Sequence, residues 1–545
     1  MAFFACKPDI SVNQDFDIPS DKALRTSNDL ENALQSAFAL LRSEDCYGAA
    51  WILWPEIMTD NFQLNPNFSG QLPERNIFHR ILLPNDTLIA KSWKAAYRTI
   101  ALANSVIDAI DKGGISDIDF EANKNRFLGE AYFLRAITHF ELVRLFAPQY
   151  SEESKGQPAI PIFNKISTSV ETRERSTVEQ VYQQILSDLD NSITSLTLAG
   201  RIININDGAD PKALVPLGRG FKIFNRPTMH IARSLKARVL MQTGVSSNFS
   251  LAVLEINKVI DDQTDKRFSS VFFQRLDVSD LRKYFPANYP LFGTYLDGFG
   301  NMFTNNVGKF AQSSVNNNYE FLFSMMNDFN DNPLTDRSDY LGGKFSLRTN
   351  QNYFNTQPPF AIERIPFGPT GRLFRRGNDK RNRAFFPSAR RITTIPLGGK
   401  DTVPACNKYN NLYFNIPVIL SADLLLLRAE ANIKLGLPKK AIYDLLCIKY
   451  RANMAPEDTF DIVKDTVGKY YKQLDANPNF SGFLLREIIR ERKREFIAEG
   501  DRLHTLRRNR MDIPTSDRGP GLPWNSPSLV FPIPDSETSL NSKIN

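Results

Sequence analysis

Apolar residues recur through the first part of the chain at the three- and four-residue spacing of amphipathic helices. The pattern begins at Leu30, Ala33 and Leu34 and returns in three later stretches that polar or loop-rich sequence separates. The predicted helices cover 28–41, 93–110, 127–146 and 176–193.

Glycine, proline and capping residues indicate where these helices begin and end. Gly113-Gly114 follows the second helix and suits a left-handed cap. Pro148 stops the third helix, since proline cannot continue the hydrogen-bond ladder. The sequence Ser176-Thr-Val-Glu179 has the spacing of a capping box, so the fourth helix is expected to begin there.

Three windows carry small residues where tetratricopeptide-type repeats pack their helix pairs. The first, 128–132, reads Leu-Gly-x-x-Tyr, and the second, 232–244, ends at a glycine. The clearest window, 427–445, has alanines on either side of Gly436, which turns the chain between two helices. The windows together predict a mainly α fold, a tetratricopeptide-like helical repeat scaffold.

The helical period fades between 262 and 417, where Asn, Gly, Pro, Phe and Tyr accumulate. One apolar run, 319–324, has the composition of a strand. A structureless connector of this length is uncommon in a compact protein, so we expect a large, irregular, loop-rich insertion. The predicted division is a lipoprotein signal remnant and tether over 1–26, an N-terminal helical part over 27–261, the insertion over 262–417, and a C-terminal helical part and tail over 418–545, with 262–545 forming one C-terminal region.

The charge pattern argues against nucleic acid as a partner. The 545 residues have a formal net charge of +7, but acidic residues regularly interrupt the basic ones. The densest basic run, 486–494, also contains Glu487 and Glu491, which is typical of an ion-paired helix face. No apolar run approaches about 18 residues, so no helix is expected to span a membrane.

The sequence contains no recognisable catalytic motif. The four histidines are too far apart for a zinc helix, and neither a phosphate-binding loop nor Gly-x-Ser-x-Gly occurs. His139 and His230 lie in helical stretches, where packing is the simpler role. We therefore expect no enzyme, no metal and no cofactor. A glycosidase pair of carboxylates leaves no linear trace, so a glycoside hydrolase on a helical scaffold remains the alternative, and a protein-binding repeat scaffold is a third interpretation.

Aromatic residues make up 11% of the chain, and several lie beside amides and carboxylates in polar stretches. Flat rings next to hydrogen-bonding groups suit sugars and also peptides, while core packing is the competing interpretation of each ring. We expect the ligand on a face built by 51–80 and 284–301. The candidate binding residues are Trp51, Trp54, Asp60, Asn61, Phe68, Arg75, Tyr284, Tyr289, Tyr295 and Asn301.

Several segments form an ordered pattern that covers nearly the whole chain. They include Trp93-x-x-x-Tyr97-x-x-Ile100-x-x-x-Asn104, Leu128-Gly-Glu-Ala-Tyr-Phe-Leu-Arg-Ala136, Arg175-Ser-Thr-Val-Glu-Gln-Val-Tyr182, Ala422-Asp423 to Ala429-Glu430-Ala431, Ile489-Arg-Glu491-Arg492-x-Arg494-Glu495-Phe496-x-x-Glu499-Gly500-x-Arg502, and Phe531-Pro-Ile-Pro534. This pattern resembles the SusD/RagB family of outer-membrane nutrient-binding lipoproteins.

The resemblance implies a helical fold of tetratricopeptide-like pairs with a large insertion. It also implies a surface protein that captures oligosaccharides, or peptides in a minority of members, for a SusC-like TonB-dependent transporter. The family's binding loops vary in sequence, so ligand residues do not carry over by motif. The charged residues of 486–502 are expected to be ion-paired scaffolding and not ligand groups.

Cys6 has the surroundings of a bacterial lipoprotein acylation site. It follows the apolar Phe3-Phe4-Ala5 and precedes a polar run, with Met1 interpreted as a start codon placed on a trimmed gene. The family resemblance implies a lipid here as well. The other cysteines, Cys46, Cys406 and Cys447, are expected to be small packed hydrophobes.

We predict that Cys6 is acylated in the native full-length product and that 7–26 form a flexible tether. Several acyl chains hold a protein at a membrane far better than a single chain does. Mass spectrometry of the native protein should find the lipid on Cys6. An unmodified Cys6, or a mature chain that starts beyond it, would contradict the prediction.

Overall fold

The computed structural model describes 24–65, 71–166, 172–199, 226–260 and most of 416–544. Within the last range, 454–469, 478, 516–519 and 542 are not described. Between 261 and 415 the described residues are 321–325, 341–345, 360–362, 391–394, 401–404, 406, 408 and 409.

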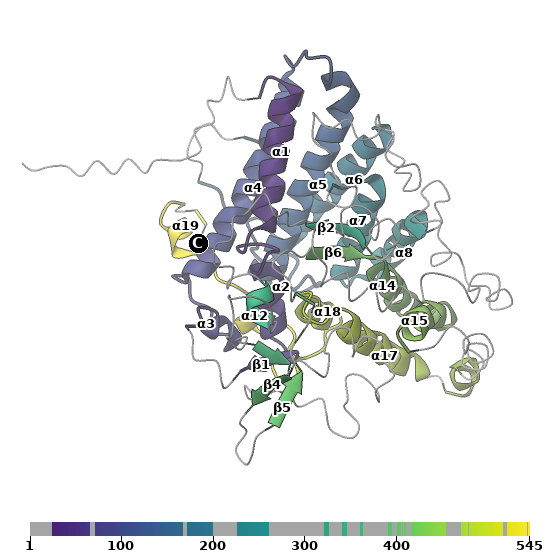
Figure 1. The fold of residues 1–545 in the computed structure, drawn as a ribbon. Helices are drawn as coiled ribbons and strands as arrows, with labels where there is room; N and C mark the ends of the chain where they lie inside the picture. Colours follow the sequence, from purple (N-terminus) through teal and green to yellow (C-terminus); the bar gives the residue numbers. More distant parts are fainter. Residues whose placement is uncertain are drawn as a thin grey trace, which may run out of the picture.

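In the part of the chain that the structure describes, nine helices form an array in which each helix packs against the next one of the array (Figure 1). The C-terminal helices continue this array from α8, so the two helical parts form one continuous layer of pairs. The fold is therefore mainly α and tetratricopeptide-like, as the sequence predicts. The array helices are α1 (Ser27–Arg42), α4 (Thr87–Lys112), α5 (Phe120–Phe146), α6 (Val178–Leu198), α7 (Met229–Gln242), α8 (Ser246–Ile260), α14 (Ser421–Lys434), α15 (Pro438–Asn453) and α17 (Phe480–Glu495).

The helix ends follow the predicted capping chemistry, except that one capping box begins one residue later than predicted. Gly113 and Gly436 have positive φ values of 74° and 72°, as the caps of α4 and α14 require. The capping box of α6 is Thr177 with Gln180, one residue later than predicted. The backbone of Ser176 instead exchanges hydrogen bonds with Ala159 and Ile160, so Ser176 is still extended chain.

Gly129 sets the distance between α5 and α6. A Cβ atom at this position would lie 2.5 Å from Leu196 Cγ on α6. Ser192 Oγ on the same helix donates a hydrogen bond of 2.7 Å to the Gly129 carbonyl. The first repeat window is thus a close helix–helix contact, as its small residue predicts.

Shorter elements cover the ends of the array. Three two-stranded antiparallel sheets join β1 to β3, β2 to β6 and β4 to β5 among the described residues. The predicted strand at 319–324 is observed as β2, whose pairing with β6 contains register shifts. These elements are α2 (Ala50–Ile57), β1 (Phe62–Leu64), α3 (Arg75–Phe78), β2 (Phe321–Met325), α12 (Leu341–Phe345), β3 (Phe360–Ile362), β4 (Arg391–Thr394), β5 (Asp401–Pro404), β6 (Ile416–Leu420), α18 (Arg502–Arg508), the 3₁₀ helix Pro527–Leu529 and α19 (Asp535–Thr538).

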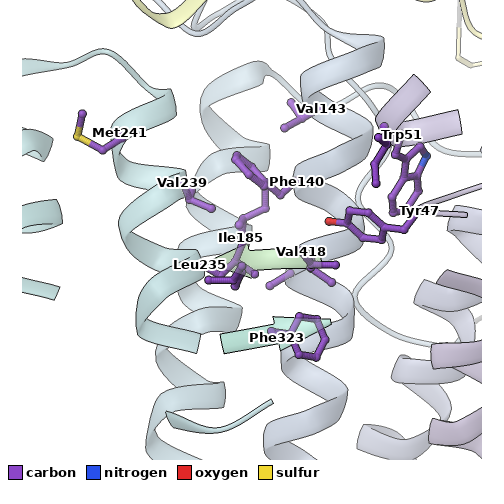
Figure 2. Close-up of a cluster of buried hydrophobic side chains, with 14 of the residues drawn as sticks. Tyr47, Trp51, Phe140, Val143, Ile185, Leu235, Val239, Met241, Phe323 and Val418 are labelled. Atoms are coloured by element: carbon purple, nitrogen blue, oxygen red, sulfur yellow. The ribbon is translucent and has the colours of Figure 1, made fainter. Parts of the chain in front are cut away.

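The hydrophobic core lies between the array helices and continues under the β2–β6 pair (Figure 2). Phe140 of α5, Ile185 of α6 and Leu235 of α7 are fully buried in it. Phe323 of β2 meets Phe133 of α5 edge to face, with ring centroids 5.2 Å apart. The described part of the insertion is therefore anchored to the helical array through apolar packing.

The C-terminal tail returns to the N-terminal helices. The amide of Phe531 donates a hydrogen bond to the Leu145 carbonyl at the end of α5. Trp93 Nε1 on α4 donates to Glu537 Oε2 in α19 at 3.2 Å. None of the helices described is long and apolar enough to cross a membrane.

Gly129→Ala should destabilise the protein because the added methyl group overlaps Leu196 on α6. Overpacking of this kind typically costs about 1–3 kcal/mol. Urea unfolding should show a lower midpoint for the variant. Gly156→Ala is the control, since a Cβ there meets no atom within 4 Å. Equal urea midpoints for Gly129→Ala and Gly156→Ala would show that Gly129 is not in close contact with α6.

Candidate functional site

The two tryptophans predicted to contact ligand are core residues. Trp51 and Trp54 lie on α2, and each is only 2% exposed. Trp51 Nε1 donates to Ser92 Oγ at 3.0 Å, and the Trp54 ring stacks on Phe531 with centroids 4.9 Å apart. All eight residues of α2 are buried. A helix that is apolar on every side packs in the interior, so this part of the predicted platform is corrected.

Asp60, another predicted ligand residue, is a buried anion between two cations. Its carboxylate accepts from Lys493 Nζ at 2.6 Å and from Arg502 Nε at 2.8 Å. Burial favours the neutral acid, but Lys493 and Arg502 outweigh it and hold the pKa of Asp60 below its usual range. The side chain therefore ties α2 to the α17–α18 region and does not face a ligand.

Asn61 is also structural, because it belongs to a hydrogen-bond group around Glu56. Asn61 Nδ2 donates to Glu56 Oε2 at 2.6 Å, and the amides of Ala498 and Gly500 donate to the same carboxylate. Gly500 has a positive φ of 79°, and a Cβ there would approach the α2 backbone at 3.0 Å. Burial raises the pKa of Glu56 to about 7 against the opposing hydrogen bonds from Asn61 and Ala498.

Arg75 is the one predicted binding residue that the described part of the chain exposes. It begins the short helix α3, and Asn76 and His79 beside it are exposed as well. The neighbouring Glu74 is buried and forms an ion pair of 2.7 Å with Lys344 of α12. This ion pair connects the N-terminal end of α3 to α12 and so helps to fix the position of α3. The other predicted residues, Cys6, Phe68, Tyr284, Tyr289, Tyr295 and Asn301, lie outside the described residues.

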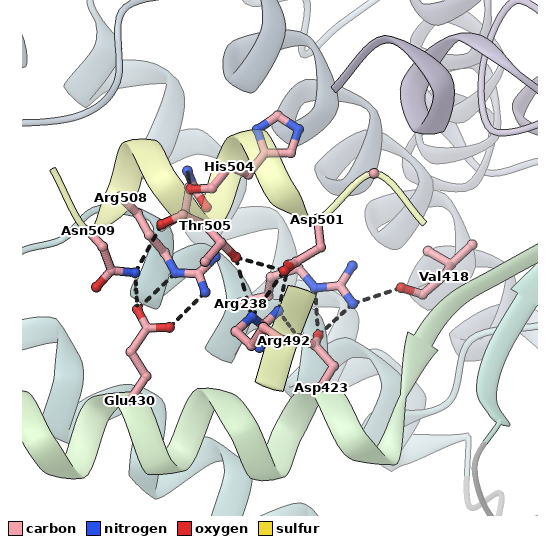
Figure 3. A network of polar contacts seen from close by, with 12 residues as sticks. Arg238, Val418, Asp423, Glu430, Arg492, Asp501, His504, Thr505, Arg508 and Asn509 are labelled. Atoms are coloured by element: carbon pink, nitrogen blue, oxygen red, sulfur yellow. Dashed lines mark hydrogen bonds and ion pairs between the residues drawn. The ribbon is translucent and has the colours of Figure 1, made fainter. Parts of the chain in front are cut away.

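A network of buried ion pairs joins α7, α14, α17 and α18 (Figure 3). Asp423 at the start of α14 accepts from Arg238 of α7 at 2.6 Å and from Arg492 of α17 at 2.7 Å. Arg492 also contacts Asp501 at 2.5 Å. A second pair in the network joins Arg508 of α18 to Glu430 of α14 at 2.7 Å. The prediction that the charged residues of 486–502 form scaffolding is confirmed.

The network surrounds a cavity of about 50 Å³ that does not provide a glycosidase site. Burial raises the pKa of Glu499 to about 7, and the two arginines bound to Asp423 hold the pKa of that carboxyl low. Two carboxyls in different protonation states suit acid–base chemistry. Pockets for small-molecule ligands, however, typically measure about 300–1,000 Å³, and each carboxylate here already has a cation partner. The arrangement stabilises the fold and has no room for a sugar chain.

Histidines and metal-ligating groups give no further sign of catalysis in the described residues. His139 is fully buried, its Nδ1 lies 3.0 Å from the Arg135 carbonyl, and burial lowers its pKa to about 3. It is a packed histidine, as expected. No group of three or more His, Cys, Asp or Glu side chains is placed to hold a metal ion in the part of the chain that the structure describes.

The fold and interior thus define a tetratricopeptide-like repeat protein in which the buried ion pairs between α7, α14, α17 and α18 serve the scaffold. Residues 16–201 match a family model described as SusD-like, "Starch-binding associating with outer membrane". Residues 400–545 match the SusD family model. The chain belongs to the SusD/RagB family.

Individual relatives agree with this assignment. A SusD-like protein from Formosa agariphila is 23% identical over 198 residues, which is 36% of this chain and 35% of the relative. The chain thus matches only about a third of that curated relative's length.

Two solved structures share the whole fold. A SusD superfamily protein from Bacteroides thetaiotaomicron is 17% identical, with a TM-score of 0.69 over 95% of this chain and 98% of its own. Surface glycan-binding protein A from Bacteroides uniformis is also 17% identical, with a TM-score of 0.61 over 95% and 98%. At these identities the likeness shows the fold.

The raised pKa of Glu56 predicts that the free energy of unfolding falls as the pH rises. Its pKa is raised from the usual 4.5 to about 7 in the folded protein. The folded state therefore binds this proton more tightly than the unfolded state does. The stabilisation is fully present below the unfolded pKa and is lost as the pH rises through about 7, with a slope of at most about 1.4 kcal/mol per pH unit.

Urea unfolding between pH 5 and 8 should show this fall, and Glu56→Gln should make it shallower. Glu499 contributes a slope of the same sign, so part of the fall should remain. Glu152→Gln, a change at an exposed carboxylate paired with Lys155, is the control and should keep the wild-type slope. An unchanged slope in the Glu56 variant would show that Glu56 does not titrate in this range.

Proposed function

We propose that this protein binds glycans at the bacterial cell surface and delivers them to a SusC-like TonB-dependent transporter. The observation that carries the proposal is the match of almost the entire chain to SusD superfamily structures, together with two SusD family models at its two ends. Fold alone does not fix function, so the ligand requires an argument of its own.

Relatives favour a glycan as the ligand over a peptide. One family model is described as starch-binding, and a protein of the same fold is named a surface glycan-binding protein. The candidate residues offer the amide, guanidinium and aromatic groups that hydroxyl-rich ligands use. Peptide remains the alternative ligand class, and the binding experiment below separates the two.

We place the ligand on the exterior of the α3 region. Because α2 is buried, its tryptophans are not assigned to the proposed ligand face. Arg75, Asn76 and His79 are exposed on α3 and supply hydrogen-bonding groups. Phe68 and the predicted residues between 284 and 301 lie outside the described residues and stay candidates for ligand binding from the sequence alone.

The transporter and the lipid belong to the same proposal. A binding protein that passes cargo to a barrel benefits from being held beside it, and the lipid on Cys6 provides that restraint. The cargo leaves intact, because SusD-family glycan-binding proteins are non-catalytic. The alternative, a glycoside hydrolase, gains no support from the described carboxylates, whose cation partners are structural.

A glycan array followed by calorimetry on the soluble chain should identify an oligosaccharide that binds and remains uncleaved. Arg75→Ala should weaken binding by about 1 kcal/mol or more, roughly fivefold in Kd, if its guanidinium contacts the ligand. Its thermal stability should stay near wild type because the side chain is exposed.

Lys91→Ala, a change at an exposed position on α4, is the matched control and should bind as wild type does. Trp54→Ala is unsuitable as a binding variant, because loss of a buried tryptophan typically costs about 3–5 kcal/mol of stability. If the Arg75 and Lys91 variants bind the oligosaccharide with equal affinity, the ligand does not bind at α3. Binding of peptides only, or cleavage that survives repurification, would overturn the function.

A further inference from the structure

Trp524 differs from the other three tryptophans of the chain because it is not part of the core. Trp51 and Trp54 are each 2% exposed, and Trp93 is 3% exposed. Trp524 is partly exposed, and it does not pack against the hydrophobic core in the part of the chain that the structure describes. Tryptophan at a surface is typical of contact sites, because its ring offers an apolar face together with an N–H group.

Hydrogen bonds to the chain that follows α18 hold the backbone around Trp524 in place. Ile513 and Leu522 exchange two backbone hydrogen bonds of 2.8 and 3.1 Å. The Trp524 amide donates to Asp512 Oδ1 at 3.1 Å. A Cβ atom at Gly521 would lie 2.3 Å from the Ile513 carbonyl oxygen, so the two segments approach as closely as a glycine allows. The backbone that carries the ring is therefore fixed before a ligand arrives, which lowers the entropy lost on binding.

Arg510 lies beside the Trp524 ring in a backbone conformation that usually requires glycine. It follows the C-cap of α18 with a φ of 53°, and the amides of Arg510 and Met511 donate to two carbonyls in the last turn of the helix. This is the pattern of a Schellman motif, in which glycine is the usual left-handed residue. The Arg510 guanidinium lies 5.6 Å from the centre of the Trp524 ring. Non-glycine residues held in this conformation cluster at ligand-binding sites, where the side chain is the reason for the strain.

Exposed polar groups lie next to the indole. The Arg510 side chain is 56% exposed, and it lies 4.0 Å from the carboxylate of Glu153, which is 73% exposed. Asp512 and Asn525 are exposed as well. A partly exposed ring beside such groups offers an apolar surface to the C–H groups of a sugar and hydrogen-bonding partners to its hydroxyls. The charges have both signs, so a neutral sugar complements this surface better than a strongly charged ligand does.

We propose that Trp524, with Arg510 and Asp512, forms a further glycan-binding surface in addition to the α3 region. The inference rests on the proposed function for the class of ligand, but it does not depend on the position of the ligand at α3. The exposed part of the indole packs against a sugar ring, while Arg510 and Asp512 form hydrogen bonds with its hydroxyls. A second contact of this kind raises the apparent affinity for a long glycan that reaches both surfaces.

Acrylamide quenching of tryptophan fluorescence tests the proposal on the soluble chain, because Trp524 is the tryptophan that is not buried. The probe is the oligosaccharide that gives the strongest wild-type signal on the glycan array. At a saturating concentration it should reduce the quenching of the wild-type chain. In the Trp524→Tyr variant, which keeps only the buried tryptophans, the same oligosaccharide should leave the quenching unchanged.

Calorimetry with the same oligosaccharide separates a stacked ring from a merely apolar side chain. Trp524→Leu should bind at least about fivefold more weakly, because leucine has no flat face, whereas Trp524→Tyr should keep most of the affinity. Leu251→Ala is the matched control, since it removes an apolar side chain that is 48% exposed on α8, and it should bind as wild type does. Urea midpoints of the Trp524 variants should stay near wild type, because the ring does not pack against the described core.

Four results would overturn the inference. Equal affinities for Trp524→Leu and wild type, or wild-type quenching that the bound oligosaccharide does not change, would remove Trp524 from the glycan surface and leave the proposed function standing. Lower urea midpoints for both Trp524 variants, with unchanged wild-type quenching, would show a structural ring. A Trp524→Leu variant that binds the oligosaccharide normally but no longer binds its transporter would assign the ring to a protein interface. A wild-type chain that binds no glycan on the array would overturn the proposed function as well.

Discussion

Asp423 imposes the constraint on which the rest of the structure depends. This buried carboxylate accepts from Arg238 of α7 through one oxygen and from Arg492 of α17 through the other. Removing one member of such a group leaves an uncompensated buried charge, which typically costs about 3–5 kcal/mol. The three helices are therefore stable in this arrangement only together. The long insertion between α8 and α14 does not divide the helical array into independent units. The ion pairs of Asp423 join α7, which precedes the insertion, to α14 and α17, which follow it.

The same principle explains why polar residues near α2 belong to the scaffold. Asp60 and Glu56 receive hydrogen bonds from Lys493, Arg502 and the 498–500 backbone, so α2 is held by groups near the C-terminus. The proposed ligand contact, Arg75, lies at an exposed position outside this interior. A protein built this way can change its binding loops without disturbing the ion pairs that maintain its shape.

Local sequence predicted the helices well, because spacing, caps and glycines act over a few residues. The repeat windows, the turn at Gly436 and the ion-paired character of 486–502 are all observed. The interpretation of Trp54 and Asp60 was wrong because their partners, Phe531 and Lys493, are more than 400 residues away in the chain. One local signal was available. The unbroken apolar run Ala-Trp-Ile-Leu-Trp of 50–54 is typical of a buried helix, whatever polar residues follow it.

The stack of Trp54 on Phe531 also affects how the chain is made. A ribosome supplies residues in order, and export across a membrane likewise passes one end of the chain before the other. The Trp54 ring therefore lacks its stacking partner until nearly the last residues of the chain have been made. The N-terminal core is completed only when the C-terminal tail packs onto it.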